Sequence, residues 1–348
     1  MSAFSETLLR WFDVNGRHDL PWQHPRTPYR VWLSEVMLQQ TQVQTVTAYF
    51  QRFVERFPSL ADLANADVDD VLALWSGLGY YSRARNLHGA ARLCVERHGG
   101  ELPRTIDALT ALPGIGRSTA AAILAQAHGE AHAILDGNVK RVLARLSGET
   151  GWPGSLAVER RLWTEAEARL PAERLADYTQ ALMDFGATLC TPRRPRCGEC
   201  PFRESCAALA ADAVALLPAR RPAKPLPTRQ TRMLVIRNAR GAVLLERRDR
   251  KGVWQGLWSL PEAADEADAG QWRLRTGCDD GSPLPPFTHV FSHYRLQVEP
   301  SLHRAHGAVA LRDGDAPSDS SPLRWAALDA LGTIGLPRPV RTLLESLP

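Results

Sequence analysis

Four cysteines between residues 190 and 206 form the densest group of reactive side chains in the sequence. Their spacing is Cys190-x6-Cys197-x2-Cys200-x5-Cys206. Four thiolates this close together suit a tetrahedral zinc ion or a four-iron cluster, and two disulfides are a third possibility. We expect no secretory signal, which disfavours disulfides. The longer gaps differ from the paired Cys-x2-Cys knuckles common at zinc, so the pattern favours iron and sulfur, although spacing alone leaves zinc open.

Glu35 is the carboxylic acid best placed for acid catalysis. It lies in a segment that we expect to be helical, residues 28–43. Residues three and four positions away are neighbours on a helix, and here they are Val31, Trp32, Leu38 and Gln39. Because most of these are apolar, desolvation should raise the pKa of Glu35 and favour the protonated form that a general acid needs. The alternative is a glutamate that pairs with an arginine or faces solvent.

Two glycines separate a pair of expected helices further along the chain. An apolar helix ends at Leu112, the run Pro113-Gly114-Ile115-Gly116 follows, and an alanine-rich helix begins near Ser118. Glycine at positions 114 and 116 permits a tight turn and the close approach of another backbone. Free N–H groups ahead of a helix bind anions, for which DNA phosphate is the natural candidate. A plain turn between two helices is the alternative.

Asp136 lies downstream of these glycines, in the run Ile134-Leu135-Asp136-Gly137-Asn138. Taken alone, an aspartate in this position predicts an N-cap for a helix that begins near Val139. For an aspartate that precedes glycine, the local pattern by itself favours this capping role over a catalytic one.

The elements that must position these side chains fall into two parts. Apolar residues recur with a spacing near 3.6 from residue 5 to about 212, with glycine and proline at the joints, which predicts helices. Short β-like runs follow at residues 233–237, 242–246, 289–291 and 294–298. We therefore predict a mainly α N-terminal domain (1–215), a proline- and arginine-rich linker (216–230) and a smaller α+β domain (231–348).

Composition limits the class of protein but does not identify it. The 348 residues are 44% apolar, enough for real cores, and contain no long apolar run that could span a membrane. The net charge of +4 equals the four basic residues of segment 221–232, which has no acidic residue. Overall charge is therefore weak evidence for nucleic-acid binding. We expect a monomeric, cytoplasmic protein that has no contact with membranes.

Several of these motifs together resemble a known family. The cysteine spacing, the hairpin glycines and the runs WLSEVMLQQTQV (32–43) and GLGYYSRARN (77–86) resemble the adenine-specific, or MutY, branch of the endonuclease III-type DNA glycosylases. The resemblance covers most of residues 20–206 and continues more weakly beyond. It implies a helix-hairpin-helix glycosylase fold with a mainly structural [4Fe-4S] cluster held by the four cysteines. It also implies hydrolysis of the N-glycosidic bond of adenine opposite 8-oxoguanine or guanine in double-stranded DNA during base excision repair.

The resemblance also implies catalytic roles. Glu35 would protonate adenine N7, and Asp136 would stabilise the cationic sugar and guide the incoming water. Asn138 would support this site. Ser118 takes a place where some members have tyrosine, and where members that also cut the strand carry a lysine that forms a Schiff base. Without that amine, we expect a monofunctional glycosylase.

Further positions match residues that contact DNA in this branch. Leu38, Gln40 and Tyr80 match residues that, in the family, wedge into the base stack beside the lesion. Trp22 and Glu159 match residues that line the adenine pocket. Gly114 and Gly116 would contact the DNA backbone. Leu38 and Trp22 could instead be core residues, Tyr80 could anchor a loop, and Gln40 could be a solvated helix residue. His18 stands where relatives often have arginine or lysine, so we assign it no pocket role.

The C-terminal domain resembles the Nudix hydrolase fold with an incomplete catalytic motif. Gly256 and Glu262 fit the first half of a Nudix box, but the run 270–275 lacks the carboxylate cluster that holds Mg²⁺. We therefore expect a recognition domain. Its run Phe291-Ser292-His293 resembles the loop that inspects the oxidised guanine, and an ordinary β-strand is the alternative.

Three other functions stay open at this point. The first is an oxidised-pyrimidine glycosylase with lyase activity, against which Ser118 and Glu35 argue. The second is an iron–sulfur DNA-binding module without enzymatic activity. The third is a nucleotide hydrolase, which the incomplete Nudix box disfavours.

Overall fold

The structure is a computed structural model that describes residues 3–222, 225–248, 252–306 and 323–347. The chain forms two compact units. The first combines Met1–Asn65 with Asn86–Ala223, and the second combines Ala66–Arg85 with Lys224–Pro348. Segment 66–85 therefore packs with the C-terminal part of the chain, whereas the sequence pattern groups it with the N-terminal helices.

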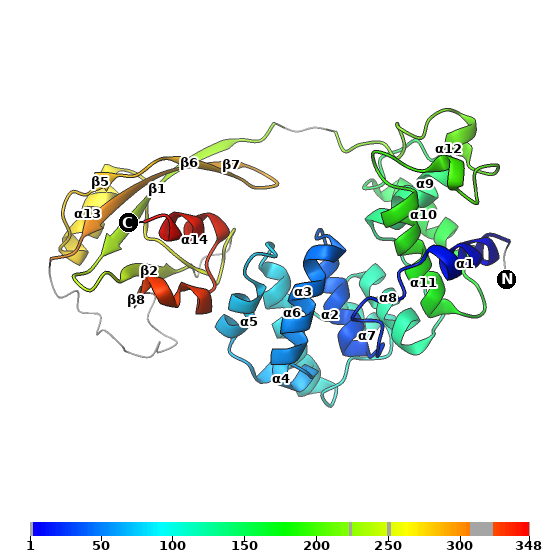
Figure 1. Ribbon diagram of the computed structural model, residues 1–348, viewed down its shortest axis with the longest axis horizontal. Coiled ribbons are helices and arrows are strands. Elements are labelled where there is room, and N and C mark those ends of the chain that lie inside the picture. Colours follow the sequence, from blue (N-terminus) through cyan, green and yellow to red (C-terminus); the bar gives the residue numbers. More distant parts are fainter. Residues whose placement is uncertain (1–2, 223–224, 249–251, 307–322, 348) are drawn as a thin grey trace. The chain divides into compact units, whose positions relative to one another are not determined.

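The first unit is helical, as predicted (Figure 1). Its helices are α1 (Ala3–Asn15), α2 (Pro28–Leu38), α3 (Val43–Arg56), α4 (Leu60–Asn65), α6 (Ser82–Arg97, which begins in the other unit), α7 (Ile106–Thr110), α8 (Arg117–His128), α9 (Gly137–Ser147), α10 (Leu156–Glu167), α11 (Leu175–Asp184) and α12 (Ala207–Ala210). A π-helical turn, Phe185–Leu189, extends α11, and a 3-10 turn, Cys197–Glu199, lies within the cysteine segment.

Helix α2 is short and almost entirely buried. Thr27 caps it by accepting a hydrogen bond from the backbone N–H of Arg30, and Pro28 occupies the first turn, where a missing N–H costs nothing. The helix ends at Leu38, earlier than the apolar spacing predicts, because the backbone turns at Gln40 with a φ of 60°. No glycine or proline marks this break in the sequence. Helix α2 packs against α8 and α3.

The second unit contains a mixed sheet with helices on both faces. Its strands are β1 (Thr228–Arg237), β2 (Val243–Arg247), β3 (Trp258–Ser259), β4 (Glu262–Ala263), β5 (Ser282–Pro283), β6 (Phe287–Val290), β7 (Arg295–Arg304) and β8 (Leu323–Ala326). Its other elements are α5 (Val68–Trp75), α13 (Glu266–Thr276), α14 (Arg338–Glu345) and a 3-10 segment, Leu328–Thr333. Strands β1 and β7 pair in parallel from Thr228↔Arg295 to Arg237↔Arg304, so β1 begins inside the expected linker.

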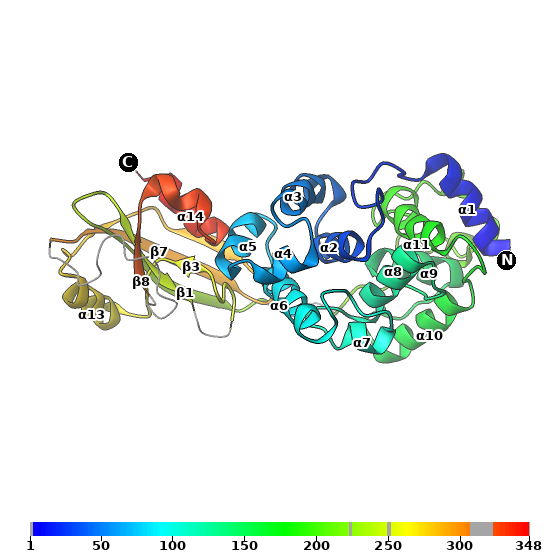
Figure 2. The same cartoon turned by 90° about the horizontal axis from the view of Figure 1, so that it is seen from below.

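Alternation along β1 explains these layers. Met233 and Val235 belong to the core that includes α14, whereas Leu234 and Ile236 belong to a separate core that includes α13. Successive residues of a strand point to opposite faces, and apolar side chains on both faces require cover on both sides. Figure 2 shows the sheet between α14 and α13.

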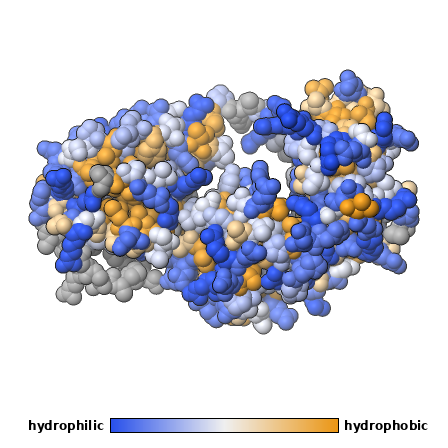
Figure 3. Space-filling model, viewed as in Figure 1, coloured by the Kyte–Doolittle hydropathy of each residue, from blue (hydrophilic) through white to orange (hydrophobic). Residues whose placement is uncertain are grey.

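Segment 66–85 is joined to the second unit by specific contacts. Asp69 accepts a hydrogen bond from the indole N–H of Trp258 at 3.2 Å and lies 3.5 Å from the guanidinium of Arg247. The hydroxyl of Tyr81 donates to the carbonyl of Leu336 at 3.0 Å. No helix in the described residues has the length and apolar character needed to cross a membrane. On the face that Figure 3 shows, apolar residues form separate patches among hydrophilic ones.

Candidate active site

Glu35 lies on the partly exposed side of α2, where protein surrounds its carboxyl group. The side chain is half-buried, and its helical neighbours Val31 and Trp32 are buried. The pKa of Glu35 is raised to about 8, chiefly by desolvation and then by the negative charge of Asp136. A hydrogen bond from Gln126 acts in the opposite direction. The carboxyl group is therefore protonated at neutral pH and still has access to the surface.

Asp136 caps helix α9 and also lies close enough to Glu35 to affect its charge. Its carboxylate accepts a hydrogen bond from the backbone N–H of Val139 at 2.7 Å. Burial raises the pKa of Asp136, while backbone hydrogen bonds and the charges of Arg141 and Lys140 lower it. The capping role expected from the sequence is present. The N-terminus of a helix also favours a negative charge, so the cap is compatible with an anionic role.

Ser118 and Asn138 hold the backbone around Asp136. The hydroxyl oxygen of Ser118 accepts a hydrogen bond from the N–H of Leu135 at 3.0 Å, next to Asp136 in the chain. The side-chain oxygen of Asn138 accepts from Arg141 at 2.9 Å. Arg141 also donates to the carbonyl oxygens of Gly186 and Cys190, at 2.7 and 2.9 Å. The segment that carries Asp136 is thereby tied to the first cysteine.

The predicted base-contacting residues of this unit have different environments. Trp22 is buried and meets Phe50 edge to face, with ring centroids 5.4 Å apart, so it packs in the core. Leu38 is half-buried and Gln40 is exposed at the end of α2. Glu159 of α10 forms an ion pair with Lys140 at 2.6 Å. The positive φ of Gln40 is uncommon for a residue other than glycine, and such backbone strain is typical of functional sites.

Of the two hairpin glycines, Gly114 has the turn conformation and close approach that the sequence predicts, whereas Gly116 has a φ of −92° that other residues can also adopt. Gly114 has a φ of 77°, and a Cβ atom there would lie 2.8 Å from the Cβ of Asn86. Gly116 is the N-cap of α8 and makes no side-chain capping hydrogen bond. The first turn of α8 thus has N–H groups that no capping side chain uses, which suits an anion such as phosphate.

The four cysteines line a common cavity. Its other lining residues are Arg145, Leu146, Phe185, Leu189, Pro195, Arg203, Leu209 and Val214. Arg145 donates to the sulfur of Cys190 at 3.4 Å and supplies a positive charge beside the thiolates. Within the described residues, no three side chains of the metal-ligating types converge tightly enough to hold a single ion. Four thiols around one cavity have the chemistry that a four-iron cluster requires.

In the second unit, a cavity of ≈ 600 Å³ is lined by residues of two predicted motifs, the run 77–86 and the run 291–293. Tyr80 lines it together with Phe291, Ser292 and His293. These last three residues form the turn between β6 and β7 and do not belong to a regular strand, and Ser292 and His293 are exposed. Tyr80 has a φ of 49° and is 49% exposed, so it stands out from the surface in a strained conformation.

Sequence reasoning missed other residues of this cavity. Trp254 and His289 line it, and both rings lie close to Phe291, with centroids 5.2 and 4.6 Å away. Trp254 has a φ of 62°. A bulky residue in this conformation could not be inferred from the sequence, because glycine adopts a positive φ with less strain and two glycines, Gly252 and Gly256, lie close by in the chain.

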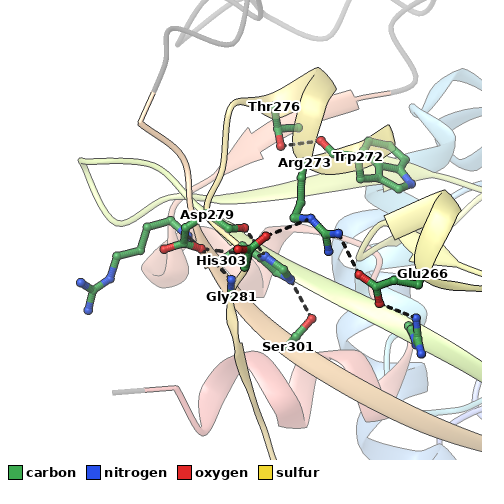
Figure 4. Close-up of polar contacts among 11 residues, drawn as sticks. Glu266, Trp272, Arg273, Thr276, Asp279, Gly281, Ser301 and His303 are labelled. Atoms are coloured by element: carbon green, nitrogen blue, oxygen red, sulfur yellow. Dashed lines mark hydrogen bonds and ion pairs between the residues drawn. The ribbon is translucent and has the colours of Figure 1, made fainter. Parts of the chain in front are cut away.

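In the Nudix-like domain, the carboxylates of β4 and of helix α13 contact arginine side chains. Glu266 pairs with Arg232 and Arg273, each at 2.7 Å, and Glu262 accepts a hydrogen bond from Arg248 at 2.9 Å. Figure 4 shows Arg273 between Glu266 and the segment that includes Asp279. These carboxylates are neutralised by arginines, and the described residues contain no cluster of three metal-ligating side chains.

Comparison with known proteins agrees with this geometry. A model of the HhH-GPD superfamily of base excision DNA repair proteins matches residues 33–168, a NUDIX domain model matches residues 232–346, and the iron–sulfur binding domain of endonuclease III matches residues 190–206. The predicted fold class and the [4Fe-4S] cofactor are thereby confirmed. The residues that would hold the cluster are the four cysteines.

Relatives of known function extend the likeness to the whole chain. The adenine DNA glycosylase of Buchnera aphidicola subsp. Acyrthosiphon pisum is 35% identical, over 99% of this chain and 97% of its own. The human adenine DNA glycosylase is 46% identical over 60% of this chain and 40% of its own. A thermostable thymine-DNA glycosylase structure is 29% identical, covers 60% of this chain and 95% of its own, and has a TM-score of 0.53. This chain belongs to the adenine DNA glycosylase family.

Proposed function

We propose that this chain acts, as a monomer, as a monofunctional glycosylase on adenine paired with 8-oxoguanine or guanine in double-stranded DNA. One observation carries the proposal: a partly exposed carboxylic acid, held by a buried amide and with a raised pKa, lies within reach of the charge of a second carboxylate. These two groups are Glu35 and Asp136. Relatives named adenine DNA glycosylase support the identity of the base.

Glu35 supplies the proton that makes adenine a leaving group. Adenine must first leave the stacked duplex, because its glycosidic bond is unreachable there. The proton of Glu35 moves to N7 of the extruded base. The bond between C1′ and N9 then breaks, its electron pair goes to the base, and the sugar becomes an oxocarbenium cation. A raised pKa makes this possible near neutral pH, because the acid still holds its proton.

Asp136 stabilises the cation that forms. Its carboxylate faces hydrogen-bond donors on the backbone and the charges of Arg141 and Lys140, all of which favour the ionised form. A negative charge at this place attracts the positive sugar and orients a water molecule for attack on C1′. The products are free adenine and an abasic site, and the water supplies the oxygen.

The absence of a lyase step follows from the residues near the hairpin. Ser118 offers a hydroxyl, which already accepts a hydrogen bond from Leu135. The nearby amine, Lys140, forms an ion pair with Glu159 at 2.6 Å. An ammonium ion in such a pair lacks the free electron pair that a Schiff base requires, so strand cleavage by this route is disfavoured.

Recognition of the oxidised base is assigned to the cavity of the second unit. Phe291 supplies an apolar ring, while Ser292 and His293 supply exposed groups that hydrogen-bond to a purine edge. Tyr80 lines the same cavity. An aromatic ring and polar groups in one cavity of this size suit a single purine.

Adenine release from duplexes under single-turnover conditions tests the proposal. Duplexes carrying adenine opposite 8-oxoguanine, guanine or cytosine should lose adenine in that order of preference. Glu35→Gln and Asp136→Asn should abolish adenine release while binding to the duplex persists. Glu96→Gln, which changes an exposed glutamate of α6, is the matched control and should react as the parent protein does. Excision at the parental rate by either active-site variant would refute the assignment.

The remaining candidate functions predict different results in the same assay. A glycosylase with lyase activity would give a strong borohydride-trapped adduct on damaged DNA. A DNA-binding module without enzymatic activity would release no adenine, with or without Glu35. A nucleotide hydrolase would convert free nucleoside triphosphates in the presence of Mg²⁺.

A further inference from the structure

Gln126 makes a buried contact with the proposed acid that neither its type nor its position in the sequence suggests. It lies in α8, which packs against α2, and its side chain is almost fully buried. Its amide nitrogen lies 3.3 Å from a carboxyl oxygen of Glu35 and donates to it. Ninety-one positions separate the two residues in the chain, so only the packing of α8 on α2 brings them together.

The oxygen of the same amide is buried and has no hydrogen-bond partner in the part of the chain that the structure describes. A buried acceptor without a partner is unfavourable, and proteins usually avoid one. An amide can also rotate by half a turn, which exchanges its donor and acceptor positions, and ordinary structural data do not distinguish the two orientations. This side chain therefore offers Glu35 either a donor or an acceptor.

We propose that Gln126 is a positioning residue for Glu35, and that its amide serves both protonation states of that carboxyl group. The NH₂ group donates to the ionised carboxylate, and the rotated carbonyl oxygen accepts from the O–H of the acid. The same side chain thus holds Glu35 in one orientation before and after it gives up its proton. This inference rests on the proposed function, in which Glu35 is the acid.

The electrostatic surroundings of Glu35 give this contact a measurable effect. Desolvation and the charge of Asp136 raise the pKa of Glu35, and the hydrogen bond from Gln126 lowers it. Asp136, at the start of α9, is the titratable group whose charge acts on Glu35. Helices α8 and α3 pack on α2, and no titratable group that the structure describes on these two helices has a charge that acts on Glu35. The hydrogen bond that the amide donates to the ionised carboxylate is charge-assisted and is therefore stronger than the one it accepts from the neutral acid, so removing the amide should raise the pKa of Glu35 further.

Gln126→Met tests the proposal, because methionine keeps the length of the side chain and removes the hydrogen bond. The rate of adenine release under single-turnover conditions should be measured from pH 5 to 10. In the parent protein, activity should fall as the pH rises through the pKa of Glu35. In the variant, this fall should move upward by about one pH unit. The plateau rate should decrease by about tenfold, because the carboxyl group is less well oriented.

A conservative variant and a control separate positioning from general loss of structure. Gln126→Glu can still donate while its own carboxyl is protonated, so it should recover part of the plateau rate at acidic pH. Gln180 offers the control, since it is a buried glutamine whose nitrogen donates to Asp184 at 2.7 Å and whose oxygen also lacks a partner in the described residues. Gln180→Met should leave the pH profile in place.

A second readout does not depend on catalysis. The infrared band of a protonated carboxyl group, identified by its loss in Glu35→Gln, should titrate at higher pH in Gln126→Met than in the parent protein. An unchanged titration and an unchanged pH profile would overturn the role of Gln126. An equal shift in Gln180→Met would also overturn it. If Glu35→Gln itself retained full activity, the proposed function would fail instead, so the two failures are distinguishable.

Discussion

Glu35 should make the folded protein less stable as the pH rises. Its pKa is raised from an ordinary value of 4.5 to about 8, chiefly by desolvation and then by the charge of Asp136. In the unfolded chain the group ionises near its ordinary pKa. The folded protein therefore holds one more proton between these two pH values, and the free energy of unfolding falls as the pH rises through this window. Above about pH 8 the loss is complete.

The size of this effect follows from the difference between the two pKa values. Each pKa unit corresponds to about 1.36 kcal/mol, so a rise from 4.5 to about 8 corresponds to at most about 5 kcal/mol. The side chain keeps some exposed surface, and solvent reduces the penalty, so we expect a loss on the order of 2–5 kcal/mol. Glu35→Gln removes the ionisable group and should escape this loss.

Urea unfolding from pH 5 to 9 measures the difference. The visible absorption of the iron–sulfur cluster follows the helical unit, because the cysteines belong to it. Glu35→Gln should gain stability relative to the parent protein as the pH rises towards 8. Glu96→Gln, at an exposed position, should follow the parent protein throughout. A difference between Glu35→Gln and the parent that stays constant over this range would refute the argument that burial keeps the carboxyl neutral.

Three further predictions concern other parts of the molecule. Gly114→Ala should destabilise the protein by about 1–3 kcal/mol and weaken duplex binding, because φ is positive and the new Cβ would meet Asn86; thermal unfolding and fluorescence anisotropy measure these effects. Cys197→Ser should reduce the visible cluster absorption, and an unchanged spectrum would exclude this residue as a ligand. His293→Ala should lower the preference for 8-oxoguanine over guanine more than it lowers basal cleavage, and equal losses on both duplexes would contradict the role of that turn.

Features of the site that depend on local patterns could be predicted from the sequence. Apolar neighbours three and four positions away predict the burial of Glu35, and the desolvation of its carboxyl agrees. The helix that follows Asp136 and the backbone turn at Gly114 are likewise present as expected. In each case the residues that determine the structure lie within one or two turns of the residue concerned.

Features that depend on packing between distant segments could not be predicted. The contact of Gln126 with Glu35 requires α8 to lie on α2. The grouping of segment 66–85 with the second unit depends on partners such as Trp258, far along the chain. Sequence patterns describe one element at a time, and they do not specify which buried polar groups will meet across an interface.

The two carboxylates illustrate how one fold assigns opposite roles to similar groups. Both are desolvated, and burial raises both pKa values. Asp136, however, caps a helix, receives backbone hydrogen bonds and faces two cations, all of which favour its ionised form. Within the described parts of the chain, Glu35 receives a hydrogen bond from Gln126 alone, and it faces the negative charge of Asp136. The acid and the anion are therefore distinguished by their surroundings. Because the charge of Asp136 helps to raise the pKa of Glu35, the group proposed to stabilise the sugar cation would also prepare the proposed proton donor.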